Sequence, residues 1–362
     1  MFLFWVRLPA GWYGTFLQPL FCRPRHPGGG LCTKPTCLEP RPNPHSETLT
    51  TGLVKHARGI QSPLPVRTFL FLLLPFFAVL PAGAQQKTAK SNTANTPLVI
   101  AGTRSETYRK VDNTELKVWI FDSAHKADKP LPAIVFFFGG GWTSGTPTQF
   151  EPQSRHLASR GMIAIVADYR VKTRHDAKPA DCVSDAKACV RWVRANAARL
   201  GIDPTRIAVG GGSAGGHLAS SVAVLPGLDT AADDKSVSCL PDALVLFNPA
   251  TVLAPFTGLN LRGFGAGLDK ERFGCEPVEI SPIHHVKAGA PPTIIFHGRA
   301  DTTVPYATVE KFAEVMQAAG NRCELVGYEG QPHGFFNKSK MAETLGATDA
   351  FLVSLGYLPA AH

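Results

Sequence analysis

One short stretch, residues 211–217 (Gly-Gly-Ser-Ala-Gly-Gly-His), constrains the fold of this chain more than any other. The apolar residues 207–209 before it favour a short buried strand, and residues 218–223 favour a helix directly after it. A strand, a tight turn and a helix, with Gly-x-Ser-x-Gly at the turn, hold a serine on a strained backbone with its hydroxyl exposed. Free N–H groups at the start of that helix favour a developing oxyanion. Ser213 is therefore a candidate nucleophile, although this stretch alone leaves an ordinary strand-to-helix turn open.

Strand-like and helix-like segments alternate along the chain. Residues 106–111 and 116–121 alternate between polar and apolar side chains, which predicts an antiparallel pair at the start of a sheet. Asp181 is expected to cap a helix that Gly201 ends. The alternation predicts an α/β fold with a doubly wound, mostly parallel sheet. Further strands are predicted at residues 133–138, 161–167, 243–247, 293–297 and 324–328, and helices at 153–160, 181–200, 306–319 and 341–355.

Two further residues complete a candidate catalytic triad. Active groups in such a sheet are expected at the carboxyl ends of its strands, where Asp301 and His333 each follow a predicted strand. A neutral imidazole can take the serine proton near neutral pH, and a carboxylate can hold that imidazole in the required tautomer. The order Ser213, Asp301, His333 is the order expected of this arrangement. Glu329 is the rival acid, but it lies close to His333 in sequence.

The three glycines at 139–141 follow a predicted strand and suit an oxyanion hole. The backbone N–H groups of Gly140, Gly141 and Ala214 are expected to bind the oxyanion, because glycine lets the main chain itself touch a substrate. A simple strand-end turn is the alternative. His217 and His297 are interpreted as structural, since one lies a helical turn past the serine and the other ends a core strand.

Five elements agree with one another: residues 138–142 (Phe-Gly-Gly-Gly-Trp), 168–170 (Asp-Tyr-Arg), 211–217, Asp301, and 331–336 (Gln-Pro-His-Gly-Phe-Phe). Together they resemble the α/β-hydrolase superfamily over about residues 106–355. Within it they are most similar to the esterase/lipase group that includes hormone-sensitive-lipase-like esterases and secreted acetyl xylan or feruloyl esterases.

The resemblance implies an α/β-hydrolase fold and a serine carboxylic ester hydrolase that works through an acyl-enzyme, without cofactor or metal. It also implies that Asp168 and Arg170 are scaffold residues. One departure is Phe138, which stands where the family usually has histidine. The glycine N–H groups do not depend on that side chain, but any hydrogen bond from the histidine is lost.

The substrate is less constrained. The segment between the strands predicted at 243–247 and 293–297 is short and glycine-rich at 263–267, which predicts a loop-like cap. An open site of this kind favours short-acyl or aromatic esters, with small-molecule and polysaccharide esters carrying acetyl or feruloyl groups as candidates. Trp142, Phe150 and Phe335 are expected to line it, although such rings are more often core residues. An amide-bond hydrolase (peptidase or arylformamidase) on the same triad, and more remotely a non-catalytic binding module, remain alternatives.

The N-terminal region predicts export. Residues 66–84 contain Arg67, an apolar run and an Ala-x-Ala cleavage site, the pattern of a secretory signal peptide. The run is shorter than the roughly 20 residues that span a bilayer, so no stable membrane association is expected after cleavage, with an uncleaved anchor as the alternative. This predicts a periplasmic or extracellular protein. Residues 1–65 stay unassigned, with a true start downstream as one hypothesis; residues 85–105 are a linker and 106–362 the catalytic domain.

Charge and cysteine content limit the remaining classes. The formal net charge of +9 is concentrated in residues 1–84, which hold eight basic and two acidic residues and leave 29 and 26 for the rest. The near-balanced remainder gives no electrostatic case for nucleic acid. No Cys/His spacing resembles a zinc site. Disulfide pairing stays open for the five cysteines after residue 84, of which 182 and 189 are about 10 Å apart on one predicted helix: Cys182, Cys189, Cys239, Cys275 and Cys323.

Overall fold

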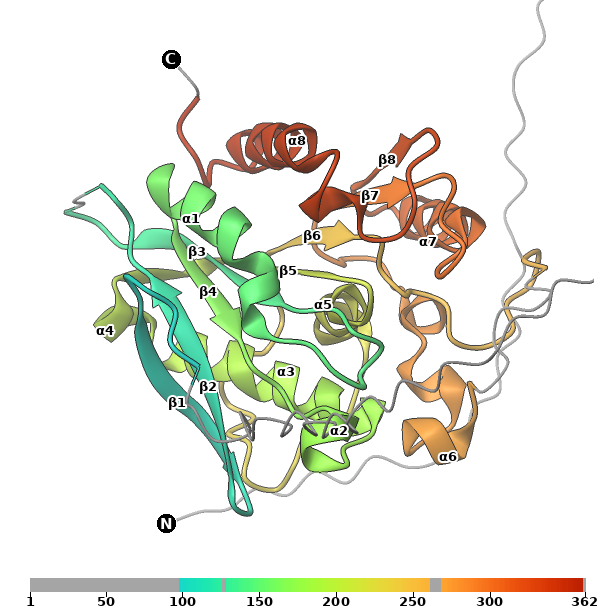
Figure 1. Ribbon diagram of the computed structural model, residues 1–362, viewed down its shortest axis with the longest axis horizontal. Helices are drawn as coiled ribbons and strands as arrows, with labels where there is room; N and C mark the ends of the chain where they lie inside the picture. The colour runs from blue at the N-terminus through green and yellow to red at the C-terminus, as the bar shows by residue number, and fades with distance from the viewer. Residues whose placement is uncertain (1–97, 126–127, 261–267, 361–362) are drawn as a thin grey trace, which may run out of the picture. The chain divides into compact units, whose positions relative to one another are not determined.

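An eight-stranded sheet runs through the part of the chain that the structure, a computed structural model, describes: residues 98–125, 128–260 and 268–360. Its strands in chain order are β1 (Arg104–Val111), β2 (Thr114–Phe121), β3 (Leu131–Phe137), β4 (Ile163–Ala167), β5 (Ile202–Gly212), β6 (Ala243–Phe247), β7 (Thr293–Gly298) and β8 (Cys323–Tyr328). Across the sheet they lie in the order β1-β2-β4-β3-β5-β6-β7-β8 (Figure 1).

The pairing of these strands confirms the predicted fold class. β1 pairs with β2, and β2 with β4, in antiparallel directions, whereas the other neighbouring strands are all parallel. Parallel neighbours place the carboxyl ends of β5, β6, β7 and β8 at one edge of the sheet. The predicted leader and signal peptide, with most of the linker, lie outside the described residues, and β1 begins slightly before the predicted domain start at residue 106.

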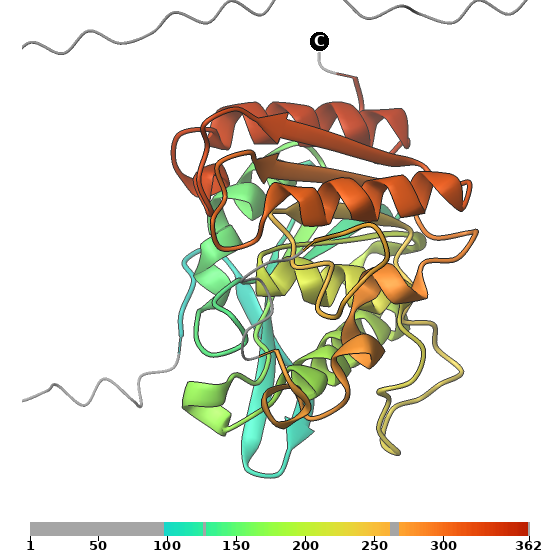
Figure 2. The same cartoon turned by 90° about the vertical axis from the view of Figure 1, so that its right-hand side faces the viewer.

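Helices cover both faces of the sheet. β3 is buried after its first residue, and its side chains alternate between two apolar cores. Val135 belongs to one that includes side chains of α3, α5 and α7, and Phe136 to one that includes side chains of α1 and α8. In the side view, β7 and β8 lie between α7 and α8 (Figure 2). The α-helices are α1 (Glu151–Ser159), α2 (Lys172–His175), α3 (Pro179–Ala195), α4 (Ala197–Leu200), α5 (Ala214–Val224), α6 (Lys270–Phe273), α7 (Tyr306–Ala318) and α8 (Met341–Ser354).

The helix predicted at residues 181–200 differs from the observed α3 at both ends. It begins earlier, with Pro179 at its first position, because the fixed φ of proline suits a helix start. Asp181 therefore lies in the first turn, where its Oδ2 accepts a hydrogen bond from the Lys178 N–H at 2.9 Å. It also breaks after Ala195, where the Asn196 side-chain amide donates to the Trp192 carbonyl oxygen at 2.8 Å. The short helix α4 then continues to Leu200, and Gly201, at φ 71°, ends it as predicted.

The segment between β6 and β7 is more ordered than the predicted loop. Besides α6 it contains two short 3₁₀ helices, Pro277–Ile280 and Pro282–His285, and Phe273 of α6 is fully buried. The glycine-rich residues 263–267 lie outside the described residues. The described part of the cap is thus built from single helical turns, with Phe273 packed into the core of the sheet domain.

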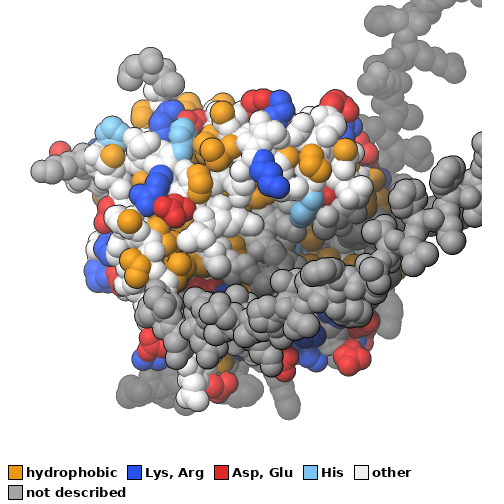
Figure 3. All heavy atoms as spheres, viewed as in Figure 1, with side chains coloured by type: hydrophobic (Ala, Val, Ile, Leu, Met, Phe, Trp, Pro, Cys, Tyr) orange, Lys and Arg blue, Asp and Glu red, His pale blue; other side chains and the backbone are white. Residues whose placement is uncertain are grey.

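The described residues were compared with three predictions, on membrane spans, cysteines and charge. None of their helices is both long and apolar enough to cross a membrane. Their five cysteines are free thiols. On the face drawn in Figure 3, basic and acidic side chains are interspersed, as the nearly balanced charge of residues 85–362 leads one to expect.

Candidate active site

Ser213 lies on a strained turn between β5 and α5. Its φ of 53° and ψ of −118° are rare for a residue with a side chain, and such strain is typical of functional turns. The outer glycines make the turn possible, because a Cβ on Gly215 would lie 2.0 Å from the Phe137 carbonyl oxygen and one on Gly211 would lie 2.5 Å from that of Gly215. The strand, turn and helix predicted around this serine are confirmed.

The end of β6 holds the main chain of Ser213. The Ser213 N–H donates to the Phe247 carbonyl oxygen at 2.9 Å, and the Ala250 N–H donates to the Ser213 carbonyl oxygen at 3.3 Å. The serine is therefore fixed by two bonds to the chain that leaves the neighbouring strand, and its strained conformation does not depend on the turn alone.

Asp301 and His333 form a close pair at the same edge of the sheet. His333 Nδ1 donates to Asp301 Oδ2 at 2.6 Å, and the N–H groups of Thr303 and Val304 donate to Asp301 Oδ1 at 2.8 and 2.9 Å. Burial alone would raise the pKa of the Asp301 carboxyl, but hydrogen bonds from His297, His333 and the Val304 N–H outweigh it and hold that pKa well below its usual range. Asp301 is thus an ionised carboxylate against the imidazole.

The rival acid lies elsewhere. Glu329 is 84% exposed at its side chain and forms an ion pair with Arg299 at 2.7 Å. His297, which the sequence suggested to be structural, has no exposed surface and donates from Nε2 to the Val304 carbonyl oxygen at 2.8 Å, with Asp301 Oδ2 3.3 Å away. It stiffens the loop that carries Asp301.

The loop that bears His333 packs beside the serine turn. A Cβ on Gly212 would lie 2.7 Å from the ring of Phe336, three residues after the histidine. Ser213 and His333 are both described residues, and no hydrogen bond joins Ser213 Oγ to His333 Nε2. Instead, His333 Nε2 faces Asn248 Nδ2 at 3.5 Å. Catalytic hydrogen bonds of this kind are often long before substrate binds and tighten in the substrate complex.

The glycine loop after β3 runs alongside the serine. A Cβ on Gly139 would lie 3.2 Å from Ser213 Cβ, and the Gly139 N–H is already used by Gln149 Oε1 at 2.6 Å. Within the residues that the structure describes, the N–H groups of Gly140, Gly141 and Ala214 have no protein acceptor. Gly140 has φ +134°, and a Cβ there would lie 2.1 Å from the Ser144 carbonyl oxygen. These three N–H groups therefore remain available to a substrate oxygen.

Trp142 fixes the far end of this loop. Its indole N–H donates to His217 Nδ1 at 3.1 Å, so the other nitrogen of His217 carries the hydrogen and donates to the Ile280 carbonyl oxygen at 2.7 Å. The Trp142 ring also packs edge-on against Phe273 of the cap. Complete burial lowers the pKa of His217 to about 4, so the imidazole is neutral at pH 7. His217 is structural, and it ties α5, the glycine loop and the cap together.

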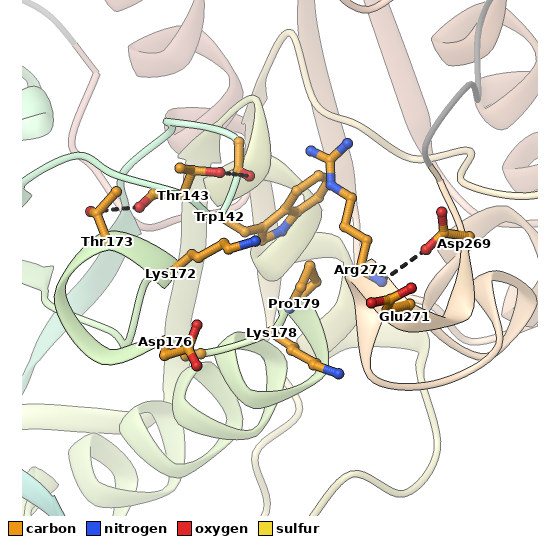
Figure 4. Close-up of a pocket in the computed structure, with 12 residues that line it drawn as sticks. Trp142, Thr143, Lys172, Thr173, Asp176, Lys178, Pro179, Asp269, Glu271 and Arg272 are labelled. Carbon is orange, nitrogen blue, oxygen red and sulfur yellow. Dashed lines mark hydrogen bonds between the residues drawn. The ribbon is translucent and has the colours of Figure 1, made fainter.

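A cavity of about 820 Å³ opens beside Gly141 and Trp142 (Figure 4). Lys172 and Arg272 lie on either side of the Trp142 ring, with the Arg272 guanidinium 5.9 Å from the ring centre. The remaining lining residues are largely polar or charged: Thr143, Thr173, Asp176, Ala177, Lys178, Pro179, Asp269 and Glu271. The walls next to the glycine loop are therefore polar, with one aromatic surface.

The expectation that Phe335 lines this pocket is wrong. Its side chain is 1% exposed and packs on Tyr328 with ring centres 4.9 Å apart, because the loop after His333 turns both of its phenylalanines into the core. Phe150 is likewise fully buried. Trp142 does line the cavity, although only 6% of its surface is exposed.

The scaffold beneath the glycine loop is polar and buried. Phe138 is 1% exposed, and its ring stacks on that of Tyr169 with ring centres 4.1 Å apart. The Tyr169 hydroxyl donates to the Phe138 carbonyl oxygen at 2.8 Å. Asp168 pairs with Arg174 at 2.6 Å, and Arg170 pairs with Asp185 at 2.8 Å. These contacts agree with the scaffold role implied for Asp168 and Arg170.

Sequence reasoning missed two polar residues of the site. Asn248 follows β6 at the same edge as the triad candidates, and this position after a buried strand was a signal that could have identified it. Gln149, which binds the Gly139 N–H, lies in the 3₁₀ helix Pro147–Phe150 and had no comparable signal.

A strained serine, a carboxylate–imidazole pair and free N–H groups, all at the carboxyl edge of a doubly wound sheet, define the class of serine hydrolases built on this fold. A family described as having the alpha/beta hydrolase fold matches residues 134–337, more than half of the chain. The chain belongs to the α/β-hydrolase family, in its esterase and lipase group.

Relatives with known names are esterases. The chain is 29% identical over 253 residues to the probable carboxylic ester hydrolase LipM of Mycobacterium tuberculosis. The matched region covers 62% of this chain and 54% of LipM. It is 32% identical over 222 residues to carboxylesterase NlhH of the same species, covering 57% of this chain and 67% of NlhH. It thus spans about half the length of LipM and two thirds of that of NlhH.

Among solved structures, the chain is similar to esterase 2 of Thermogutta terrifontis. The apo form is 48% identical with a TM-score of 0.69, covering 74% of this chain and 100% of that one. The propionate-bound form is 49% identical with a TM-score of 0.68, covering 72% and 97%.

Proposed function

We propose that this chain is a serine carboxylic ester hydrolase that uses Ser213, His333 and Asp301 through an acyl-enzyme. The observation that carries the proposal is the 2.6 Å bond between His333 Nδ1 and the ionised Asp301, on a loop packed against the strained serine turn. The esterase names of its relatives support the same reaction class.

The reaction follows from these groups. Ser213 Oγ attacks the ester carbonyl carbon and passes its proton to His333 Nε2, while the carbonyl π electrons move to the oxygen, which the N–H groups of Gly140, Gly141 and Ala214 stabilise. The carbon–oxygen bond to the alcohol then breaks, and the alcohol leaves with the proton from His333. Water repeats the sequence on the acyl-enzyme and releases the acid. Asp301 stays ionised and stabilises the imidazolium throughout.

The expected substrates are small esters with a polar alcohol portion. The cavity beside the glycine loop is lined by Lys172, Lys178, Asp176 and Glu271 around one aromatic surface, a setting that suits hydroxyl-rich groups better than a long alkyl chain. Carbohydrate-linked acetyl or feruloyl esters combine a short or aromatic acyl group with such an alcohol. Propionate and butyrate occupy solved forms of the Thermogutta esterase, which supports a short acyl group here.

A substrate panel tests this proposal. Acetylated xylan, methyl ferulate, formylkynurenine and long-acyl esters are compared by kcat/KM on the purified protein. Highest activity on acetylated xylan or methyl ferulate supports the ester proposal. Formylkynurenine as the best substrate indicates amide hydrolysis, and inactivity on every ester, with no labelling by a fluorophosphonate, indicates a binding module.

We further propose that the protein is exported by a signal peptide at residues 66–84 and acts in the periplasm or outside the cell. The support is the sequence pattern of Arg67, an apolar run and the Ala-x-Ala site. Mass spectrometry of the mature protein is expected to find its N-terminus at Gln85. An intact N-terminus upstream of the apolar run contradicts cleavage.

A further inference from the structure

Asn248 is a buried polar residue that the proposed reaction does not use. It follows β6 directly, has no exposed surface, and adopts φ +36°, in the left-handed region that asparagine tolerates better than most residues. Its N–H donates to the Phe296 carbonyl oxygen of β7 at 2.7 Å. The backbone is therefore fixed to β7 at the point from which the side chain projects.

The Asn248 side chain contacts the His333 loop at two points. Its Oδ1 accepts a hydrogen bond from the Gly334 N–H at 3.1 Å, and its Nδ2 lies 3.5 Å from His333 Nε2. The orientation of the amide is forced, because a backbone N–H can only donate and so must face the oxygen. The NH₂ group then necessarily faces the imidazole.

The nitrogen that Nδ2 faces is the one that would receive the serine proton. His333 Nδ1 carries the ring hydrogen and donates a hydrogen bond to Asp301, so Nε2 of the neutral imidazole carries the lone pair. Asp301, from the loop after β7, is the charged group against the imidazole, with His297 of β7 on the far side of that carboxylate. Arg299, directly after β7, and Glu329, directly after β8, form a solvent-exposed ion pair with each other.

We propose that Asn248 is a positioning residue for His333, an inference that rests on the proposed role of His333 as the base. Through Gly334 it anchors the loop, and through Nδ2 it offers a long, weak hydrogen bond to Nε2 that holds the neutral ring until the serine hydroxyl replaces it. The residue before it, Phe247, accepts from the Ser213 N–H, so one short segment after β6 sets the positions of both base and nucleophile.

The isosteric variant Asn248→Asp is the central test. It keeps an oxygen for the Gly334 N–H but turns a second carboxylate oxygen toward His333 Nε2. A carboxylate favours the imidazolium, so the rise of kcat/KM with pH should move to higher pH by about one unit or more, with activity recovering under alkaline conditions. The leucine variant, Asn248→Leu, loses both contacts, and its kcat should fall on the order of 100-fold at every pH because the base is misplaced.

Asn321 supplies a matched control. It is also a buried asparagine, and it joins a loop by accepting from the Ala290 N–H at 3.0 Å and donating to the Lys287 carbonyl oxygen at 2.8 Å, but it precedes β8 at the opposite edge of the sheet. Asn321→Asp should lower Tm and leave the pH profile of kcat/KM unchanged. A purely structural role for Asn248 predicts the same behaviour for both variants.

The outcomes separate this inference from the proposed function. If His333→Ala keeps wild-type kcat, the assignment of the base is wrong. If His333→Ala is inactive while Asn248→Asp has the kcat and pH profile of the wild type, the Asn248 inference alone is wrong. Should the Asn248 variants not fold, ¹⁵N NMR of the wild-type protein still decides: an Asn248 side-chain NH₂ signal that shifts as His333 titrates supports the inference, and an unshifted signal, or a hydrogen on His333 Nε2 in the neutral ring, contradicts it.

Discussion

At the scale of single residues, the choice of catalytic acid lies between Asp301 and Glu329. Both follow strands, but only Asp301 contacts His333. Asp301→Asn should lower kcat by roughly 10⁴ near neutral pH, since an amide presents the wrong tautomer of the histidine. Glu329→Gln should leave kcat nearly unchanged, because that carboxylate is exposed and paired with Arg299. Steady-state kinetics of the two variants checks this, and the opposite ranking would refute the choice of acid.

Phe138 and Gly140 test the glycine loop from opposite sides. Phe138→His places a polar ring where Phe138 stacks on Tyr169, so the variant should lose about 1–3 kcal/mol of stability with kcat nearly preserved. Gly140→Ala should lower kcat by roughly 10²–10³, the loss typical of an oxyanion donor, because its Cβ would meet the Ser144 carbonyl oxygen at 2.1 Å. Tm and kcat measured together separate the two effects. A hundredfold loss of kcat at unchanged Tm in Phe138→His would place residue 138 in the catalytic machinery.

The positions of the proposed triad residues could be predicted where a motif and a strand end coincided. Ser213 and Asp301 follow strands with buried ends, His333 follows the half-buried strand β8, and the parallel sheet brings these strand ends to one edge. The prediction that Phe335 lines the pocket was wrong because two adjacent phenylalanines show no periodic pattern that indicates the direction of either side chain. Both side chains turn into the core.

His217 carries a prediction at the scale of elements, since it joins α5, the glycine loop and the cap. Its pKa of about 4 in the folded protein is below the ordinary 6.5, so the unfolded chain takes up the proton first as pH falls. The stability that the neutral imidazole provides is present above pH 6.5 and is lost toward pH 4, in total on the order of 3 kcal/mol.

Thermal unfolding between pH 7 and pH 4 checks this assignment. His217→Asn should have a lower Tm than the wild type at pH 7, because the shorter side chain does not reach both the Trp142 indole and the Ile280 carbonyl oxygen, but a flatter decline of Tm across this pH range. Parallel curves for the two proteins would show that another group controls acid stability.

Strands were easier to predict than helix ends and the cap. The apolar run of β6 and the helix α7 lie within one residue of their predicted bounds, because long buried or periodic segments carry the clearest pattern. The break between α3 and α4 falls at the single residue Asn196, and the described part of the cap consists of single turns too short to show a period.

At the scale of the whole molecule, the short cap, whose described part consists of single helical turns, predicts selectivity for acyl length. A long acyl chain would stay in water, and each methylene left unburied forgoes about 0.8 kcal/mol. Acetate or propionate esters should therefore exceed octanoate esters in kcat/KM, measured on a nitrophenyl ester series. A preference that rises with chain length would indicate an apolar tunnel and a true lipase.

The central claim is that Ser213 is the nucleophile, and covalent labelling tests it most directly. Wild-type protein and Ser213→Ala are treated with a fluorophosphonate, digested and mapped by mass spectrometry, with Tm and nitrophenyl acetate hydrolysis measured on the same samples. The account predicts one adduct on Ser213 in the wild type, none in the variant, an unchanged fold, and a loss of kcat of about 10⁶. An adduct on another residue, or a folded variant that keeps a tenth of the wild-type kcat, would contradict it.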